Sequence, residues 1–156
     1  MEPTKELQAK LVEEMKGRMA QDDSSVPMPD GPYAYFSRYT EGGEYPIRSR
    51  ISRSDLESGA WSADGPAPAS QEDLVDGNVL GAGQEFFKLG AIEHSPDHKL
   101  VAYSVDLKGS EYFTVMFKDI ATGEMMKDEL VNCSSSFVWC KDSKTVVYAV
   151  IDDNHR

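Results

Sequence analysis

Several features that would identify common classes of protein are scarce or absent in this chain of 156 residues. No apolar run approaches the roughly 20 residues that a membrane-spanning helix requires, which argues against a membrane partner. The N-terminus mixes acids with bases and has no apolar core segment, so it is neither a secretory signal nor a good transit peptide. Cysteine occurs only at Cys133 and Cys140, in a spacing typical of neither a metal site nor a disulfide framework. We therefore expect a cytoplasmic protein whose two thiols are buried or half-buried and reduced.

Positive charge is also in short supply. The chain has 16 Lys and Arg against 27 Asp and Glu, a formal net charge of −11. Nucleic-acid binding needs a basic surface that displaces phosphate counterions, so nucleic acid is excluded as a partner. The acidic surface suits cationic peptides, although acidic surfaces also simply keep proteins soluble. The composition, 40% hydrophobic and 28% charged, is typical of one globular domain.

The usual catalytic motifs are missing as well. There is no Gly-x-Ser-x-Gly, and His94, His98 and His155 have no serine and acid in a context that suggests a triad. His94 and His98 are four positions apart, but Ser95-Pro96-Asp97 between them predicts a turn, not the helix that would place both on one face for a metal. Gly81-x-Gly83 precedes no helix and is interpreted as a turn. We assign no catalytic, cofactor-binding or metal-binding residue and expect the chain to be inactive alone.

Residues 1–23 form an N-terminal segment with a helical pattern over residues 5–19. Four apolar residues recur at every fourth position: Leu7, Leu11, Met15 and Met19. Thr4 is placed to cap the start of this helix. The apolar face lacks the aromatics and the basic charge of membrane-surface or calmodulin-target helices, so we expect it to pack against the rest of its own protein.

Residues 24–156 are dominated by strand and turn patterns. Residues 22–32 have turn chemistry, and residues 33–39 and 45–52 predict two strands joined by a glycine-containing hairpin loop. Residues 54–73, rich in Ala, Gly, Pro and Ser, predict a long surface loop. Trp61 within it is either a recognition tip or, as we favour, the anchor of the loop. Residues 74–80 are expected to form a short strand before the glycine turn at residue 81.

An internal repeat is the strongest architectural signal. Residues 94–105 align without gaps on residues 139–150, an offset of 45 residues, and a weaker copy lies near Asp30. The offset is within the roughly 40–50 residues of a four-stranded propeller blade. The aspartates Asp97 and Asp142 match, and we expect each to form the turn between the first two strands of a blade. The chain has material for about two blades and stops after the second strand of another, which predicts a fragment truncated in mid-blade.

The order of these motifs resembles the N-terminal β-propeller of the prolyl oligopeptidase family of serine peptidases (family S9), most of all its oligopeptidase B branch. The resemblance rests on residues 30–50, 86–124 and 137–156. The second segment is the most specific, with Ser95-Pro96-Asp97 and Thr122-Gly123-Glu124 in the family's order. Residues 54–73 fall outside the resemblance and look like an insertion.

The resemblance implies a mainly β fold: an N-terminal α-helix (residues 1–23) and a partial β-propeller (residues 24–156), about two blades of a seven-bladed propeller. It implies as partner an α/β-hydrolase domain of the same parent chain, which carries a Ser-Asp-His triad and cleaves short peptides after Arg or Lys. The propeller would restrict access, and the helix would pack on the catalytic domain. No position here matches a triad residue. Two alternatives stay open: a standalone β-repeat interaction module without activity, and a fragment that complements a separately encoded remainder.

Overall fold

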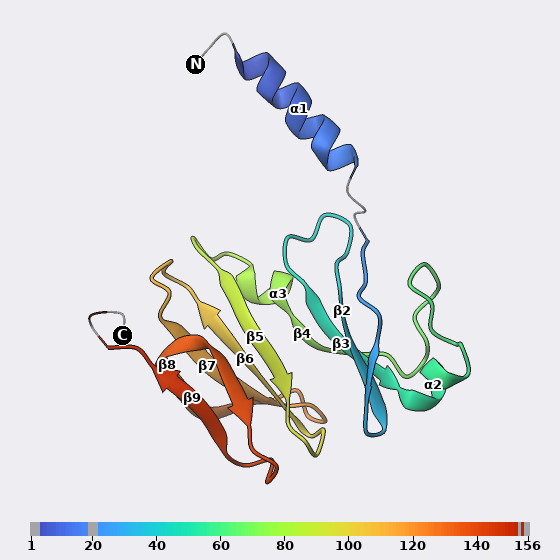
Figure 1. The fold of residues 1–156 in the computed structure, drawn as a ribbon, viewed down its shortest axis with the longest axis vertical. Helices are drawn as coiled ribbons and strands as arrows, with labels where there is room; N and C mark the ends of the chain where they lie inside the picture. Colours follow the sequence, from blue (N-terminus) through green and yellow to red (C-terminus); the bar gives the residue numbers. More distant parts are fainter. Residues whose placement is uncertain (1–3, 19–21, 153, 155–156) are drawn as a thin grey trace.

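The computed structural model describes residues 4–18, 22–152 and 154 (Figure 1). Met19 and His155 lie outside these residues. In chain order the elements are α1 (Lys5–Gly17), β1 (Met28–Asp30), β2 (Tyr33–Arg38), β3 (Ile47–Ser52), α2 (Arg53–Glu57), β4 (Glu72–Asp76), α3 (Gly77–Gly81), β5 (Lys88–His94), β6 (Leu100–Asp106), β7 (Phe113–Asp119), β8 (Met125–Trp139) and β9 (Val146–Val150). Among the described residues, no helix is long and apolar enough to cross a membrane. The expectation of a mainly β chain behind an N-terminal helix is confirmed.

The N-terminal helix α1 forms as predicted, but its apolar face has no partner in the described part of the chain. Leu7, Leu11 and Met15 are exposed by 57%, 47% and 66%, and no residue of the helix is buried. The surface on which α1 was expected to pack is therefore not supplied by the strands that the structure describes.

The first sheet has the order β1-β2-β3-β4, with every neighbouring pair antiparallel. Strands β2 and β3 confirm the hairpin prediction. The prediction of turn alone for residues 22–32 is wrong in part, because β1 pairs with β2 from Met28↔Tyr35 to Asp30↔Tyr33. Residue propensities do not predict such a short strand, because it needs only a tight turn and can contain Pro29 at the edge of a sheet. Gly31 supplies that turn with a φ of 54°.

The prediction of one loop over residues 54–73 is also wrong in part. Helix α2 begins this segment, where the Ser52 hydroxyl accepts a hydrogen bond from the Asp55 N–H at 3.1 Å, and β4 begins at its end. Between them, Trp61 packs on the buried cluster of Ala34, Phe36 and Ile51, with its ring centroid 5.7 Å from that of Phe36. Trp61 is therefore the anchor of the loop.

The expected strand over residues 74–80 ends early. Strand β4 stops at Asp76, and α3 follows because the Asp76 carboxylate accepts hydrogen bonds from the N–H groups of Asn78 and Val79. This capping by a side chain overrides the apolar pattern of Val79 and Leu80.

The second sheet has the order β5-β6-β7-β8-β9 and contains both strong copies of the repeat. The two aspartate turns have the same geometry. The Asp97 carboxylate accepts from the Lys99 N–H and that of Asp142 from the Lys144 N–H. The next residues, His98 and Ser143, both adopt a left-handed conformation, with φ of 61° and 56°. The predicted repeat is confirmed as a structural one.

Strand β8 is long and serves two partners. Its first part pairs with β7 up to Cys133, and its second part pairs with β9 from Cys133 to Trp139. The second part crosses close to β5 and β6, where the Ser104 hydroxyl donates to the Ser135 carbonyl at 2.7 Å. Gly90 makes room there, because a Cβ at this position would lie 2.3 Å from the Ser104 Oγ.

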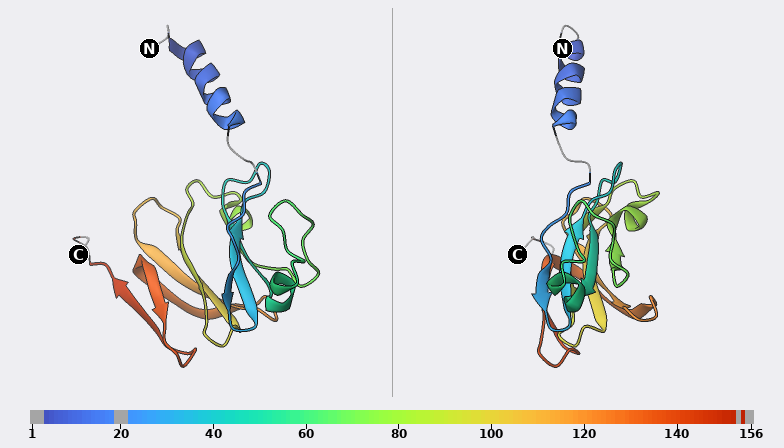
Figure 2. Two further views of the ribbon diagram at one scale, coloured as in Figure 1. Left: turned by 45° about the vertical axis from the view of Figure 1, so that its right-hand side comes forward. Right: turned by 90° about the vertical axis from the view of Figure 1, so that its right-hand side faces the viewer.

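The two sheets stand side by side and share one core (Figures 1 and 2). It contains seven buried residues from the two sheets and their connection: Tyr35, Leu74, Val75, Phe87, Val101, Tyr103 and Val105. Cys133 is buried and Cys140 half-buried, both free, as expected. The seam between the sheets is the place where side chains of distant segments meet.

Candidate functional site

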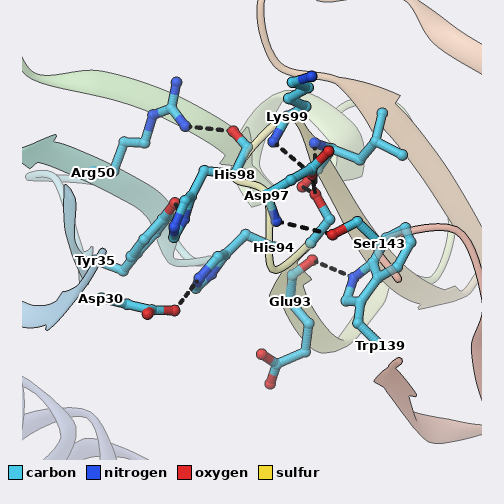
Figure 3. Close-up of polar contacts among 12 residues, drawn as sticks. Asp30, Tyr35, Arg50, Glu93, His94, Asp97, His98, Lys99, Trp139 and Ser143 are labelled. Carbon is cyan, nitrogen blue, oxygen red and sulfur yellow. Dashed lines mark hydrogen bonds and ion pairs between the residues drawn. The ribbon is translucent and has the colours of Figure 1, made fainter. Parts of the chain in front are cut away.

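Polar and aromatic side chains gather at one end of the seam between the sheets, where β5 turns into β6 (Figure 3). We call this group the junction cluster, and its members are Asp30 of β1, Tyr35 of β2, Arg50 of β3, His94 of β5 and His98 of the turn. The aspartate turn brings His98 back toward the first sheet, whereas β5 itself carries His94.

Tyr35 is the centre of the junction cluster. Its ring is stacked on the His94 ring, with centroids 3.6 Å apart and planes only 4° apart. Its hydroxyl lies 2.8 Å from the Nδ1 of His98. Burial raises the pKa of Tyr35, so the hydroxyl stays protonated and can donate to the imidazole. The His98 ring fits here because Gly31 has no side chain, since a Cβ on Gly31 would lie 2.4 Å from the His98 Nε2.

Arg50 ties three parts of the chain together. Its Nε and Nη2 reach Glu72 Oε2 of β4 at 2.8 and 2.7 Å, and its Nη1 donates to the His98 carbonyl at 2.8 Å. Its guanidinium carbon lies 3.8 Å from the centroid of the Tyr33 ring, a cation–π geometry. The side chain is only 7% exposed, so a charge is buried here with all its contacts made within the protein.

His94 is held in the neutral form. Its Nε2 lies 2.9 Å from Asp30 Oδ2, whereas its Nδ1 is buried and has no hydrogen-bond partner among the described residues. Burial lowers the pKa of His94, and the bond to Asp30 opposes this effect; the positive charge of Arg48 lowers the pKa further. A neutral ring with its proton on Nε2 therefore donates to Asp30.

Asp30, His94 and His98 are the set of possible metal ligands that the described residues bring together, with ligand atoms within 4.8 Å of one another. The histidines do not share a helix, as expected, yet the turn still makes their rings converge. The His94 ring lies against the face of Tyr35, whereas His98 meets the Tyr35 hydroxyl through an edge nitrogen. The two imidazole rings are stacked, so the nitrogen lone pairs of His94 and those of His98 lie in two different planes. A zinc ion about 2.0–2.1 Å from both would break the stack.

The arrangement thus favours a hydrogen-bonded contact between sheets over a metal centre or a hydrolytic site. Within the described ranges, the side chains of His94 and His98 bond to Asp30 and Tyr35 and to no serine. The assignment of no catalytic or metal-binding residue stays a prediction. The sequence pattern pointed to both histidines but not to Tyr35 and Arg50, which lie 63 and 48 positions from His98. Only the weak third copy of the repeat pointed to this region.

The chain is similar to known proteins over nearly its whole length. Residues 1–156 match the family model described as prolyl oligopeptidase, N-terminal beta-propeller domain. The chain is 36% identical over 154 residues to dipeptidyl aminopeptidase BI of Pseudoxanthomonas mexicana, covering 95% of this chain and 21% of the relative. It is 27% identical over 158 residues to Protease 2 of Moraxella lacunata, covering 100% and 22%.

Solved structures give the same result for the fold. Oligopeptidase B from Leishmania major superposes with a TM-score of 0.85 at 26% identity, covering 99% of this chain and 20% of that one. Oligopeptidase B from Trypanosoma brucei gives 0.82 at 23% identity with the same coverage, which supports the fold alone. The chain spans about a fifth of the length of these relatives. The predicted partial propeller behind an N-terminal helix is confirmed.

Proposed function

Because the chain belongs to the prolyl oligopeptidase family and matches its N-terminal β-propeller domain, we propose that it serves a serine peptidase similar to oligopeptidase B as the non-catalytic part that controls access. The observation that carries this proposal is the match of the whole chain to the propeller model, together with the TM-score of 0.85.

In this proposal an α/β-hydrolase domain of the same gene product cleaves short peptides after Arg or Lys. The net charge of −11 is favourable for attracting such cationic peptides. The exposed apolar face of α1 docks on the hydrolase domain, which gives Leu7, Leu11 and Met15 the partner that they lack in the described chain. The two free thiols suit a cytoplasmic location.

A second candidate is favoured by the relative at 36% identity, which is named a dipeptidyl aminopeptidase. Under this alternative the gene product releases dipeptides from a free N-terminus instead of cutting within a peptide. The propeller would play the same restricting part, and the two candidates differ in how the substrate amine is recognised.

Paired substrates separate the two candidates. The gene product that carries this chain is assayed on a fluorogenic peptide with a blocked N-terminus and Arg before the scissile bond, and on a dipeptide with the same Arg and a free amine. Cleavage of the blocked peptide supports the first candidate, and cleavage of the free dipeptide alone supports the second. If neither is cleaved and a serine-directed covalent inhibitor labels nothing, both are refuted.

The size of the gene product is an independent test. An antibody against this chain should detect a band several times larger than 17.3 kDa in cells that express it. A band of 17.3 kDa would contradict a hydrolase domain in the same chain and favour a standalone interaction module.

A further inference from the structure

The seam between the two sheets contains a half-buried histidine whose buried Nδ1 has no hydrogen-bond partner among the described residues. We propose that the junction cluster is a proton-sensitive latch, closed while His94 is neutral and loosened when mild acid protonates it. The inference concerns the fold of this chain and does not depend on which peptides the gene product cleaves. It adds a regulated joint to a domain otherwise expected to be a passive barrier.

The latch is built from contacts that cross the seam. At this end the crossing contacts are the Tyr35–His94 stack and three polar bonds: His94 to Asp30, Tyr35 to His98, and Arg50 to the His98 carbonyl. At the other end, the Tyr45 hydroxyl donates to the Phe87 carbonyl. Lys118 of β7 is level with His94 in the second sheet and reaches the Leu74 carbonyl of β4. Each of the four contacts made by β1, β2 and β3 therefore involves residue 94 or residue 98. His94 takes part in two of them and His98 in the other two.

Protonation of His94 is unfavourable in this environment. The added proton would sit on Nδ1, which is buried and has no acceptor among the residues that the structure describes. Asp30 would attract the new charge, but its carboxylate is 59% exposed, so water screens the attraction. Water does not reduce the cost of desolvating the charged ring in the same way, because the His94 side chain is only 14% exposed.

The charges around His94 add to this effect. The charged and titratable groups that interact with His94 or with its neighbours in the cluster are Asp30 of β1, Tyr33 and Tyr35 of β2, Arg48 and Arg50 of β3, Glu93 of β5, and His98 of the turn. Arg48 and His98 both disfavour a second positive charge. Tyr35 stays neutral because burial raises its pKa. Asp30 is the acid that bonds directly to the ring, and Glu93 acts on Arg48.

The direction of the pH effect follows from linkage. Burial lowers the pKa of His94 in the folded state below the ordinary value of 6.5. The unfolded or opened state therefore binds the proton more tightly. The contribution of His94 to closure is complete above about pH 6.5 and is lost as the pH falls through the folded-state pKa.

The repeat shows that this latch is specific to one seam. In the alignment of residues 94–105 on 139–150, Trp139 stands where His94 stands and Ser143 where His98 stands. Trp139 donates its Nε1–H to the Glu93 carbonyl at 3.2 Å, and the Ser143 hydroxyl accepts from the Asp97 N–H at 3.0 Å (Figure 3). The same two repeat positions thus hold the next seam through groups that do not titrate near neutral pH. The second seam is an internal control for the first.

Hydrogen–deuterium exchange of the gene product tests the latch. Exchange is measured at about pH 7.5 and about pH 5.5, with labelling times scaled to the intrinsic exchange rates. We expect β2 and the segment from β5 to the turn (residues 88–98) to exchange faster at the lower pH, because the opened state binds the proton more tightly. The amides around Trp139 and Ser143 should not change.

Two variants remove the titration in different ways. His94→Phe keeps an aromatic ring on Tyr35, as Trp139 does at the next seam, and His94→Gln keeps a donor for Asp30. After correction for the intrinsic exchange rates, the backbone amides of each variant should be equally protected from exchange at the two pH values. The latch is refuted if wild-type protection is equal at both pH values or if both variants still open in acid.

A direct titration keeps the proposal testable if both variants misfold. With 13C-labelled histidine in the wild-type protein, the resonance assigned to His94 should titrate below about 6.5. A midpoint at or above that value would overturn the proposal, because acid would then tighten the contact with Asp30.

Discussion

Replacing Arg50 by Met should destabilise the propeller strongly, because the guanidinium holds three segments at once. The change removes the bond to the half-buried His98 carbonyl, at a cost of about 1–3 kcal/mol. It also removes the ion pair with Glu72, worth about 1 kcal/mol because Glu72 is 52% exposed, and a cation–π contact over Tyr33 worth about 0.5–2 kcal/mol. Relief of the desolvated charge offsets part of this loss. We expect a net loss of about 3 kcal/mol.

A loss of that size lowers the melting temperature by about 6–12 °C in an unfolding unit of about 150–250 residues, and by less in a larger unit. The measurement is thermal unfolding of the gene product, followed by circular dichroism at constant pH and salt. Arg53→Met is the matched control, since the Arg53–Glu57 pair is 50% and 64% exposed and should contribute no more than about 0.5 kcal/mol. If the two variants shift the melting temperature equally, the role given to Arg50 is wrong.

Three further substitutions test other features. Gly90→Ala should cost about 1–3 kcal/mol by overpacking, whereas Gly17→Ala, where a Cβ meets no atom within 4 Å, should be tolerated; equal melting temperatures would contradict the close crossing of β8. Hydrogen bonds from the Thr145 hydroxyl, the Lys144 N–H and the Thr145 N–H lower the pKa of Asp142 from 3.8 to about 2. The contribution of Asp142 to stability is therefore present above pH 3.8 and is lost as the pH falls toward 2. The difference in melting temperature between wild type and Asp142→Ala should shrink over that range, and a constant difference would count against the turn. Leu11→Asp should lower both the melting temperature and the peptidase activity by breaking the proposed docking of α1, with Lys10→Asp as the control; unchanged values for Leu11→Asp would exclude that docking.

Local patterns in the sequence predicted those parts of the fold that depend on near neighbours. The Asp97 and Asp142 turns are recognisable because each carboxylate bonds to a backbone N–H only two positions further along. The hairpin of β2 and β3 has strands of suitable composition around a glycine-containing loop. Helix α1 follows a simple period of apolar residues.

The parts that could not be predicted depend on long-range contacts or on single side chains. Strand β1 exists because a tight turn lets three residues pair with β2, which no composition argument anticipates. Helix α3 exists because one aspartate caps it. The junction cluster joins residues 63 and 48 positions apart, so it appears only when the two sheets are placed side by side.

The continuous strand β8 determines where this part of the domain can bend. One strand runs through the second seam and pairs on both sides of it, so relative motion there would have to distort an extended backbone. At the first seam, the chain passes from β4 to β5 through α3 and a short connection, and none of the strands that the structure describes belongs to both sheets. In mechanical terms, two joints of unequal stiffness act in series, and a load on the pair is taken up by the softer one. We therefore expect deformation to concentrate at the softer joint, where Tyr35 stacks on His94.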